Sequence, residues 1–127
     1  MALIAIIDDD PDILDAGSIV LQSNGYTVIT ATNPKDGFNL VKANNPDLII
    51  LDVMMIEADD GFFLAQKFRR EGFKTPILMY TSVSKTLGFQ FGKSDIVPVD
   101  DFLEKPVTPE VLLEKVEKLL KEHTEVK

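Results

Sequence analysis

The sequence predicts a single α/β domain with a doubly wound, five-stranded parallel sheet between two layers of helices (α/β/α). Short apolar runs alternate along the chain with segments whose apolar residues recur at helical spacing. This alternation indicates repeated strand–helix–strand units with parallel strands. The chain has 127 residues, enough for one domain and few for two. We therefore assign residues 1–127 to one domain.

The N-terminal half begins with a strand at residues 3–7, a continuous apolar run typical of a strand buried on both faces. Asp10–Pro11 supplies an N-cap and a first-turn proline for a helix that ends at Asn24–Gly25. Residues 26–31 are the second strand. Asn33–Pro34 repeats the cap signal and opens the second helix.

The C-terminal half supplies three more strands, at residues 47–52, 76–81 and 102–104. A helix is expected over residues 62–70, whose register contains Phe63, Leu64, Lys67 and Phe68. A further helix is assigned to residues 82–99, although their apolar periodicity is poor.

Thr108–Pro109–Glu110 opens the last helix. Its predicted buried stripe is Leu112, Val116, Leu119 and Leu120. Its predicted water-facing residues are Glu114, Lys115, Glu117, Lys118 and Lys121. Because only a few polar residues follow this helix, we expect no output domain.

Composition excludes several classes of function. The net charge of −8 argues against a broad basic surface for nucleic acid. The absence of cysteine excludes disulfides, thiolate metal sites and a cysteine nucleophile, and His123 lies among charged residues that favour a solvated side chain. The apolar start of the chain is too short to span a membrane and runs into three aspartates, so we expect a cytoplasmic protein.

Polar residues follow the predicted strands where each strand ends. Residues 8–10 are three aspartates after the first strand, Asp52 ends the third, Thr81 ends the fourth and Lys105 follows the fifth. Ligands of an open parallel sheet bind outside the carboxyl ends of its strands, near the point where the strand order reverses. We therefore expect these residues to converge on one pocket.

The residue types of this pocket suit phosphoryl chemistry. Clustered carboxylates repel one another unless a cation lies among them, and Mg²⁺ favours a few carboxylates together with water and phosphate. A carboxylate can also act as a nucleophile and form an aspartyl phosphate. Positive charge from a metal ion and a lysine stabilises the transferring phosphoryl group.

Four segments resemble the receiver domain of two-component response regulators, and the resemblance covers the whole chain. They are residues 6–10 (IIDDD), 51–55 (LDVMM), 78–82 (LMYTS) and 102–106 (FLEKP). The resemblance implies a flavodoxin-like (βα)₅ fold, like that of stand-alone chemotaxis regulators. It also implies a signalling switch that a histidine kinase or a phosphotransfer protein phosphorylates.

The resemblance assigns a role to each matching residue. Asp52 matches the phosphoacceptor, and Asp8 and Asp9 match the acidic pair that holds Mg²⁺ together with Asp52. The remaining matches are the Met54 carbonyl as a backbone metal ligand, Thr81 as the switch hydroxyl, Lys105 as the phosphate-binding lysine and Phe102 as the aromatic that changes rotamer. The bond between Lys105 and Pro106 matches one that is usually cis in the family.

The same resemblance implies a switch without turnover, and an unidentified protein partner downstream. We expect no contact with nucleic acid or membrane, and either a monomer or a phosphorylation-dependent homodimer. Met54 and Val83 match the positions that flank the approach of water, and both are apolar, so we expect slow hydrolysis of the phosphoaspartate. The sequence departs from the family at Ile56, where a proline is common, and in slightly longer segments after Asp52 and Thr81.

Two alternative functions remain. A phosphorylation-independent binding module would lack Asp52, Asp9 or Lys105, and all three are present. A Mg²⁺-dependent phosphohydrolase with an aspartate nucleophile usually carries a second aspartate two residues later, where this chain has Met54.

Overall fold

The fold was analysed in a computed structural model that describes residues 2–52, 60–81, 99–104 and 108–125. Five parallel strands form one sheet in the order β2-β1-β3-β4-β5, which confirms the predicted doubly wound class. The strands are β1 (Leu3–Ile7), β2 (Thr27–Ala31), β3 (Leu48–Asp52), β4 (Ile77–Thr81) and β5 (Asp101–Glu104). The helices are α1 (Pro11–Gln22), α2 (Pro34–Asn44), α3 (Asp60–Arg70) and α5 (Pro109–Glu125). The helix assigned to residues 82–99 falls almost wholly outside the described residues.

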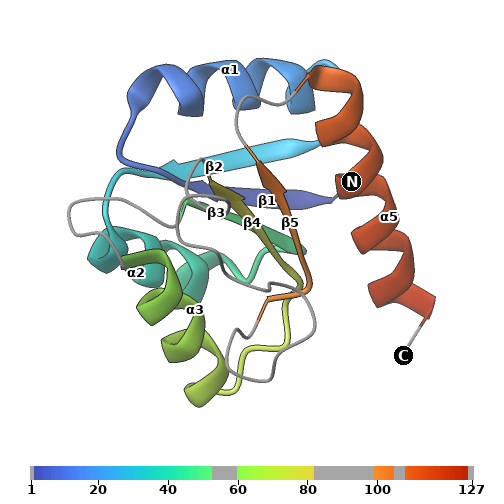
Figure 1. Ribbon diagram of the computed structural model, residues 1–127. Helices are drawn as coiled ribbons and strands as arrows, with labels where there is room; N and C mark the ends of the chain where they lie inside the picture. The colour runs from blue at the N-terminus through green and yellow to red at the C-terminus, as the bar shows by residue number, and fades with distance from the viewer. Residues whose placement is uncertain (1, 53–59, 82–98, 105–107, 126–127) are drawn as a thin grey trace.

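Helices cover both faces of the sheet: α1 and α5 lie on one face, and α2 and α3 lie on the other (Figure 1). The central strands alternate strictly between the two resulting cores. Ala5, Ile7, Ile49 and Leu51 pack with α2 and α3, whereas their neighbours along the same strands pack with α1 and α5. Successive side chains of a strand point to opposite faces, so a continuous apolar run supplies both cores at once.

The predicted caps are confirmed at both N-terminal helices. The Asp10 side chain accepts a hydrogen bond from the Asp12 amide at 2.9 Å, and the Asn33 side chain accepts one from the Asp36 amide at 2.8 Å. Each satisfies an amide that the first helical turn leaves without an intrahelical partner. Gly25 has φ of +91°, in the left-handed region that favours glycine, which explains why the chain turns there into β2.

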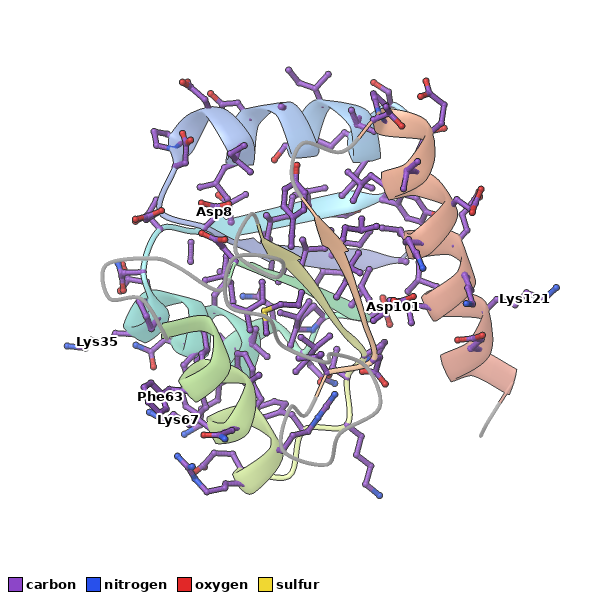
Figure 2. All side chains as sticks on the ribbon, viewed as in Figure 1. Asp8, Lys35, Phe63, Lys67, Asp101 and Lys121 are labelled. Carbon is purple, nitrogen blue, oxygen red and sulfur yellow. The ribbon has the colours of Figure 1, made fainter. Side chains whose placement is uncertain are left out.

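One predicted water-facing residue of α5 is placed differently. The Lys115 Nζ lies 2.9 Å from Asp101 Oδ2, and both side chains are about a quarter exposed. Asp101 lies where β5 faces α5 in Figure 2. The prediction that Lys115 faces water was therefore wrong, because a carboxylate at the start of β5 holds its ammonium group against the sheet. Val116 and Leu119 are buried as predicted.

Phe63 also differs from its predicted register. The buried stripe of α3 is Gly61, Leu64, Ala65 and Phe68, whose spacing repeats at three and four residues. Phe63 lies one position before Leu64, at the border of this stripe, and 63% of it is exposed. None of the described helices is both long enough and apolar enough to cross a membrane.

Replacement of Gly37 by alanine is expected to destabilise the protein by roughly 1–2 kcal/mol. A Cβ atom at Gly37 would lie 2.8 Å from two side-chain carbons of Ile7, in the strand beneath α2. Overpacking of this kind costs about 1–3 kcal/mol, which exceeds the gain of up to about 1 kcal/mol in helix propensity. Urea denaturation measures the loss.

Gly17→Ala is the matched control, because its Cβ atom would meet only the end of Ile6, at 3.2 Å. We expect Gly17→Ala to be the more stable of the two variants. Equal stability would show that α2 moves away from Ile7 without cost.

Candidate functional site

The candidate site lies where the strand order reverses. The chain passes from β1 outward to β2 and then returns to β3 on the other side of β1, so the connections after β1 and β3 leave the sheet in opposite directions. A crevice forms between such connections, at the carboxyl ends of the two strands. Asp8 follows β1 and Asp52 ends β3.

Strand register brings these two aspartates level with each other. Ile7 of β1 pairs with Leu51 of β3, so the next residue on each strand is an aspartate. The Asp8 amide continues the strand by donating to the Ala31 carbonyl of β2 at 3.1 Å. Both side chains are buried, with 1% of Asp8 and 5% of Asp52 exposed.

A local turn fixes the direction of the three aspartates after β1. Asp8 Oδ1 accepts a hydrogen bond from the Asp10 amide at 2.9 Å, and Asp10 Oδ1 accepts one from the Asp12 amide at the same distance. These two successive bonds lead the chain from β1 directly into α1. Asp10 is therefore the cap of α1, while Asp9, between the two turns, is exposed beside the buried pair.

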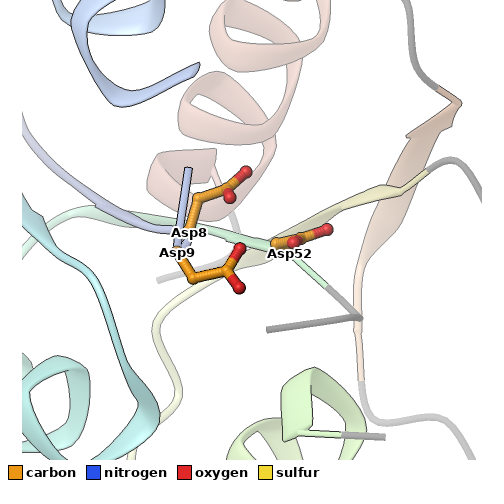
Figure 3. Close-up of side chains that lie close together, drawn as sticks. All are labelled: Asp8, Asp9 and Asp52. Carbon is orange, nitrogen blue, oxygen red and sulfur yellow. The ribbon is translucent and has the colours of Figure 1, made fainter. Parts of the chain in front are cut away.

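Asp8, Asp9 and Asp52 form a carboxylate cluster. One oxygen from each residue lies within 4.8 Å of the others (Figure 3). Ligands of a Mg²⁺ ion lie about 2.1 Å from it, which places the ligands about 3–4 Å from one another. The oxygens and their spacing therefore fit a small hard cation. Burial of two of the three carboxylates favours such an ion, because neighbouring negative charges repel more strongly away from water.

Of the other predicted site residues, only Thr81 and Phe102 lie within the described part of the chain. Thr81 ends β4, one position beyond the Tyr80 that pairs with Asp52, so its backbone lies at the same edge of the sheet. Phe102 lies in β5 and pairs with Met79 of β4. The structure describes the backbone of these two residues but not their side chains. Met54 and Lys105 lie outside the described residues.

A sequence comparison identifies a family that matches most of the chain. The profile of the family described as the response regulator receiver domain matches residues 4–117. The DNA-binding dual master transcriptional regulator RpaA of Synechocystis sp. PCC 6803 is 39% identical over 127 residues, an alignment that covers 95% of this chain and 50% of RpaA. The chain thus spans about half the length of this relative.

Two solved structures with the same fold align with this chain over nearly their whole length. The chemotaxis protein CheY4 of Vibrio cholerae has a TM-score of 0.83 and 32% identity, with 94% of this chain and 98% of that chain covered. The response regulator TrrA of Thermotoga maritima, solved in complex with Mg²⁺-BeF, has a TM-score of 0.78 and 29% identity, with 94% and 99% covered.

Sequence reasoning missed one surface residue that could take part in binding. Phe63 was grouped with the apolar register of its helix, yet it is one of three large hydrophobic residues that are exposed in the described part of the chain. The signal was present, because Leu64 and Phe68 lie four residues apart and define the buried stripe, which leaves Phe63 at its border.

Proposed function

Because the chain belongs to the response regulator receiver domain family, we propose that it is a phosphoacceptor switch that is phosphorylated on Asp52 in a Mg²⁺-dependent reaction. The observation that carries this proposal is the cluster of Asp8, Asp9 and Asp52 at the reversal of strand order. The cluster combines the proposed nucleophile, Asp52, with the proposed acidic metal ligands, Asp8 and Asp9, at one edge of the sheet. The phosphodonor is a histidine kinase or a phosphotransfer protein.

The proposed reaction moves one phosphoryl group to Asp52. A carboxylate oxygen of Asp52 attacks the phosphorus and forms a P–O bond, while the P–N bond of the donor phosphohistidine breaks and leaves its electron pair on the imidazole nitrogen. Asp52 is held at the end of β3 by pairing with Tyr80 of β4. This anchoring keeps the nucleophile in a constant position relative to Asp8 and Asp9.

Asp8, Asp9, Asp52 and the Met54 carbonyl would hold Mg²⁺. When bound, the ion neutralises the negative charge that develops on the phosphoryl oxygens. TrrA, which has the same fold, was solved with Mg²⁺-BeF. That complex supports the metal assignment proposed here, as do the burial of Asp8 and the hydrogen bond from the Asp10 amide that orients its carboxylate.

Switching follows from the charge that phosphorylation adds. Lys105 would pair with the phosphoryl group, the Thr81 hydroxyl would donate a hydrogen bond to it, and Phe102 would change rotamer as β4 and β5 adjust. Thr81 and Phe102 lie on the adjacent strands β4 and β5. A small movement at the end of β4 therefore reaches β5 through backbone pairing.

Incubation with acetyl phosphate tests the proposal. Intact mass measurement should show one added phosphoryl group in the presence of Mg²⁺. It should show none when EDTA is present to chelate the metal. The modification should be lost on mild alkaline treatment, as expected of an acyl phosphate. Labelling that is independent of Mg²⁺, or stable to alkali, would refute the proposal.

Lys105→Ala is expected to leave the fold intact and to weaken the response to phosphorylation. Without the lysine, the phosphoryl oxygens lose one charge-assisted partner, a class of interaction worth about 1.5–3 kcal/mol. The chemical shift changes that beryllofluoride and Mg²⁺ induce in the amide NMR spectrum should therefore become smaller. A full response would show that the lysine is dispensable.

Hydrolysis of the phosphoaspartate is expected to be slow, on a scale of minutes or longer. Neither Met54 nor Val83 can orient a water molecule for attack on phosphorus. Decay after removal of the phosphodonor should accelerate in the double variant Met54→Asn, Val83→Glu. Loss within seconds in the wild type, or no acceleration in the variant, would contradict this expectation.

A further inference from the structure

A groove lies between the outer surfaces of α2 and α3, on the face of the sheet opposite α1 and α5. Its volume is about 520 Å³. Three of its lining residues are cationic (Lys35, Lys67 and Arg70), and four are apolar (Pro34, Phe38, Phe63 and Leu64). We call it the cationic–aromatic groove. Lys35, Phe63 and Lys67 all project to the outside of these two helices in Figure 2.

Phe63 is the most exposed of the apolar residues that line the groove. Its exposed fraction is 63%, while Leu64 beside it is buried in the core between α3 and the sheet. Covering an exposed phenylalanine with a partner stabilises the complex, because the apolar surface of the ring is removed from water. Aromatic side chains of this kind are enriched among the residues that dominate the binding energy of interfaces.

The charge of the groove is opposite to that of the protein. The chain carries a net charge of −8, yet none of the described residues that line the groove is acidic. Asp36, the acid in the first turn of α2, accepts a hydrogen bond from the side chain of Asn33, the cap residue, at 2.9 Å. The positive groove is therefore a local exception on an acidic molecule.

The floor of the groove is firmly held. The Phe38 ring stacks on Phe68 with 5.6 Å between centroids, and it meets Phe73 edge-on at 6.2 Å. Lys67 Nζ lies 4.2 Å from the centre of the Phe38 ring, so a cation–π contact positions one of the three cations. A partner would consequently bind a surface that needs little rearrangement, which lowers the cost of association.

We propose that the cationic–aromatic groove binds an acidic segment of another protein, with an apolar side chain of that segment packed on Phe63. Carboxylates of the segment would pair with Lys35, Lys67 and Arg70. A second copy of this chain is disfavoured because two molecules of charge −8 repel each other. A nucleic acid is disfavoured because only three of the described lining residues are cationic and the chain as a whole carries a net charge of −8. This inference is independent of phosphorylation at Asp52.

Fluorescence polarisation with a defined probe tests the proposal on the full chain. The probe is a short fluorescent peptide in which glutamates surround leucine and phenylalanine. It should bind saturably, and amide NMR shifts should map to α2 and α3. We expect Phe63→Ala to weaken binding about tenfold or more, and Lys35→Glu to weaken it several-fold. Both residues are exposed, so both variants should keep the fold.

Matched variants on the other face separate this site from general effects. Ile19→Ala removes an equally exposed hydrophobic residue of α1 (65% exposed), and Lys121→Glu reverses an exposed cation of α5. Both should bind the peptide as the wild type does. Four results would overturn the proposal: no saturable binding, equal losses in these controls, equal affinity for polyglutamate or a single-stranded oligonucleotide, or sedimentation showing that Phe63 mediates self-association.

Discussion

Asp52→Asn is expected to abolish phosphorylation by acetyl phosphate completely. The asparagine amide keeps the shape of the side chain but has no carboxylate oxygen to attack phosphorus. Because Asp52 is 5% exposed and lies at the end of a buried strand, the isosteric change should leave the fold intact. Intact mass spectrometry of both proteins, under the same Mg²⁺ and phosphodonor, measures the effect.

The matched control for this experiment is Asp15→Asn. Asp15 is an exposed acid in the middle of α1, outside the carboxylate cluster, and its variant has the same change of charge. It should be phosphorylated to the same extent as the wild type. Persistent labelling of Asp52→Asn would move the phosphoacceptor to another residue, and equal loss in Asp15→Asn would show that net charge controls the reaction.

Asp9→Ala is expected to weaken Mg²⁺ binding by about tenfold or more, by removing a carboxylate ligand from a cation that prefers oxygen. At ten times its dissociation constant, Mg²⁺ should stabilise the wild type by about 1.4 kcal/mol, or roughly 5 °C in Tm. The variant should show little of this stabilisation at the same concentration. It should also block phosphorylation.

Without Mg²⁺, Asp9→Ala is expected to be more stable than the wild type. Repulsion between unit charges a few ångströms apart costs on the order of 1–3 kcal/mol at the effective dielectric of a partly buried site. Asp9→Ala relieves part of it and should melt above the metal-free wild type. Asp15→Ala is the control, with a normal response to Mg²⁺. Thermal melts with and without Mg²⁺ decide the question, and an unchanged Mg²⁺ response in Asp9→Ala would exclude Asp9 as a ligand.

The sequence by itself determined the strands, the starts of α1 and α2, and the presence of aspartates at the carboxyl ends of β1 and β3. Apolar runs such as residues 3–7 and 48–51 can be buried only when both faces of the sheet are covered, which already requires helices on both sides. Asp10 and Asn33 cap their helices through contacts within three residues, so their positions follow from local chemistry. The distance between Asp8 and Asp52 was not available from the sequence.

Tertiary structure decided the features that depend on residues far apart in the chain. The pairing of Ile7 with Leu51 sets Asp8 level with Asp52, and a shift of one residue would have turned one side chain to the opposite face. Lys115 is held by Asp101, fourteen residues away, although the apolar periodicity of its helix predicted a water-facing side chain. Phe63 shares its helix with buried neighbours but lies at the edge of their stripe, where the placement of α2 beside α3 leaves it exposed. Local periodicity specifies which side of a helix or strand is apolar, whereas the packing of whole elements decides which groups that side meets.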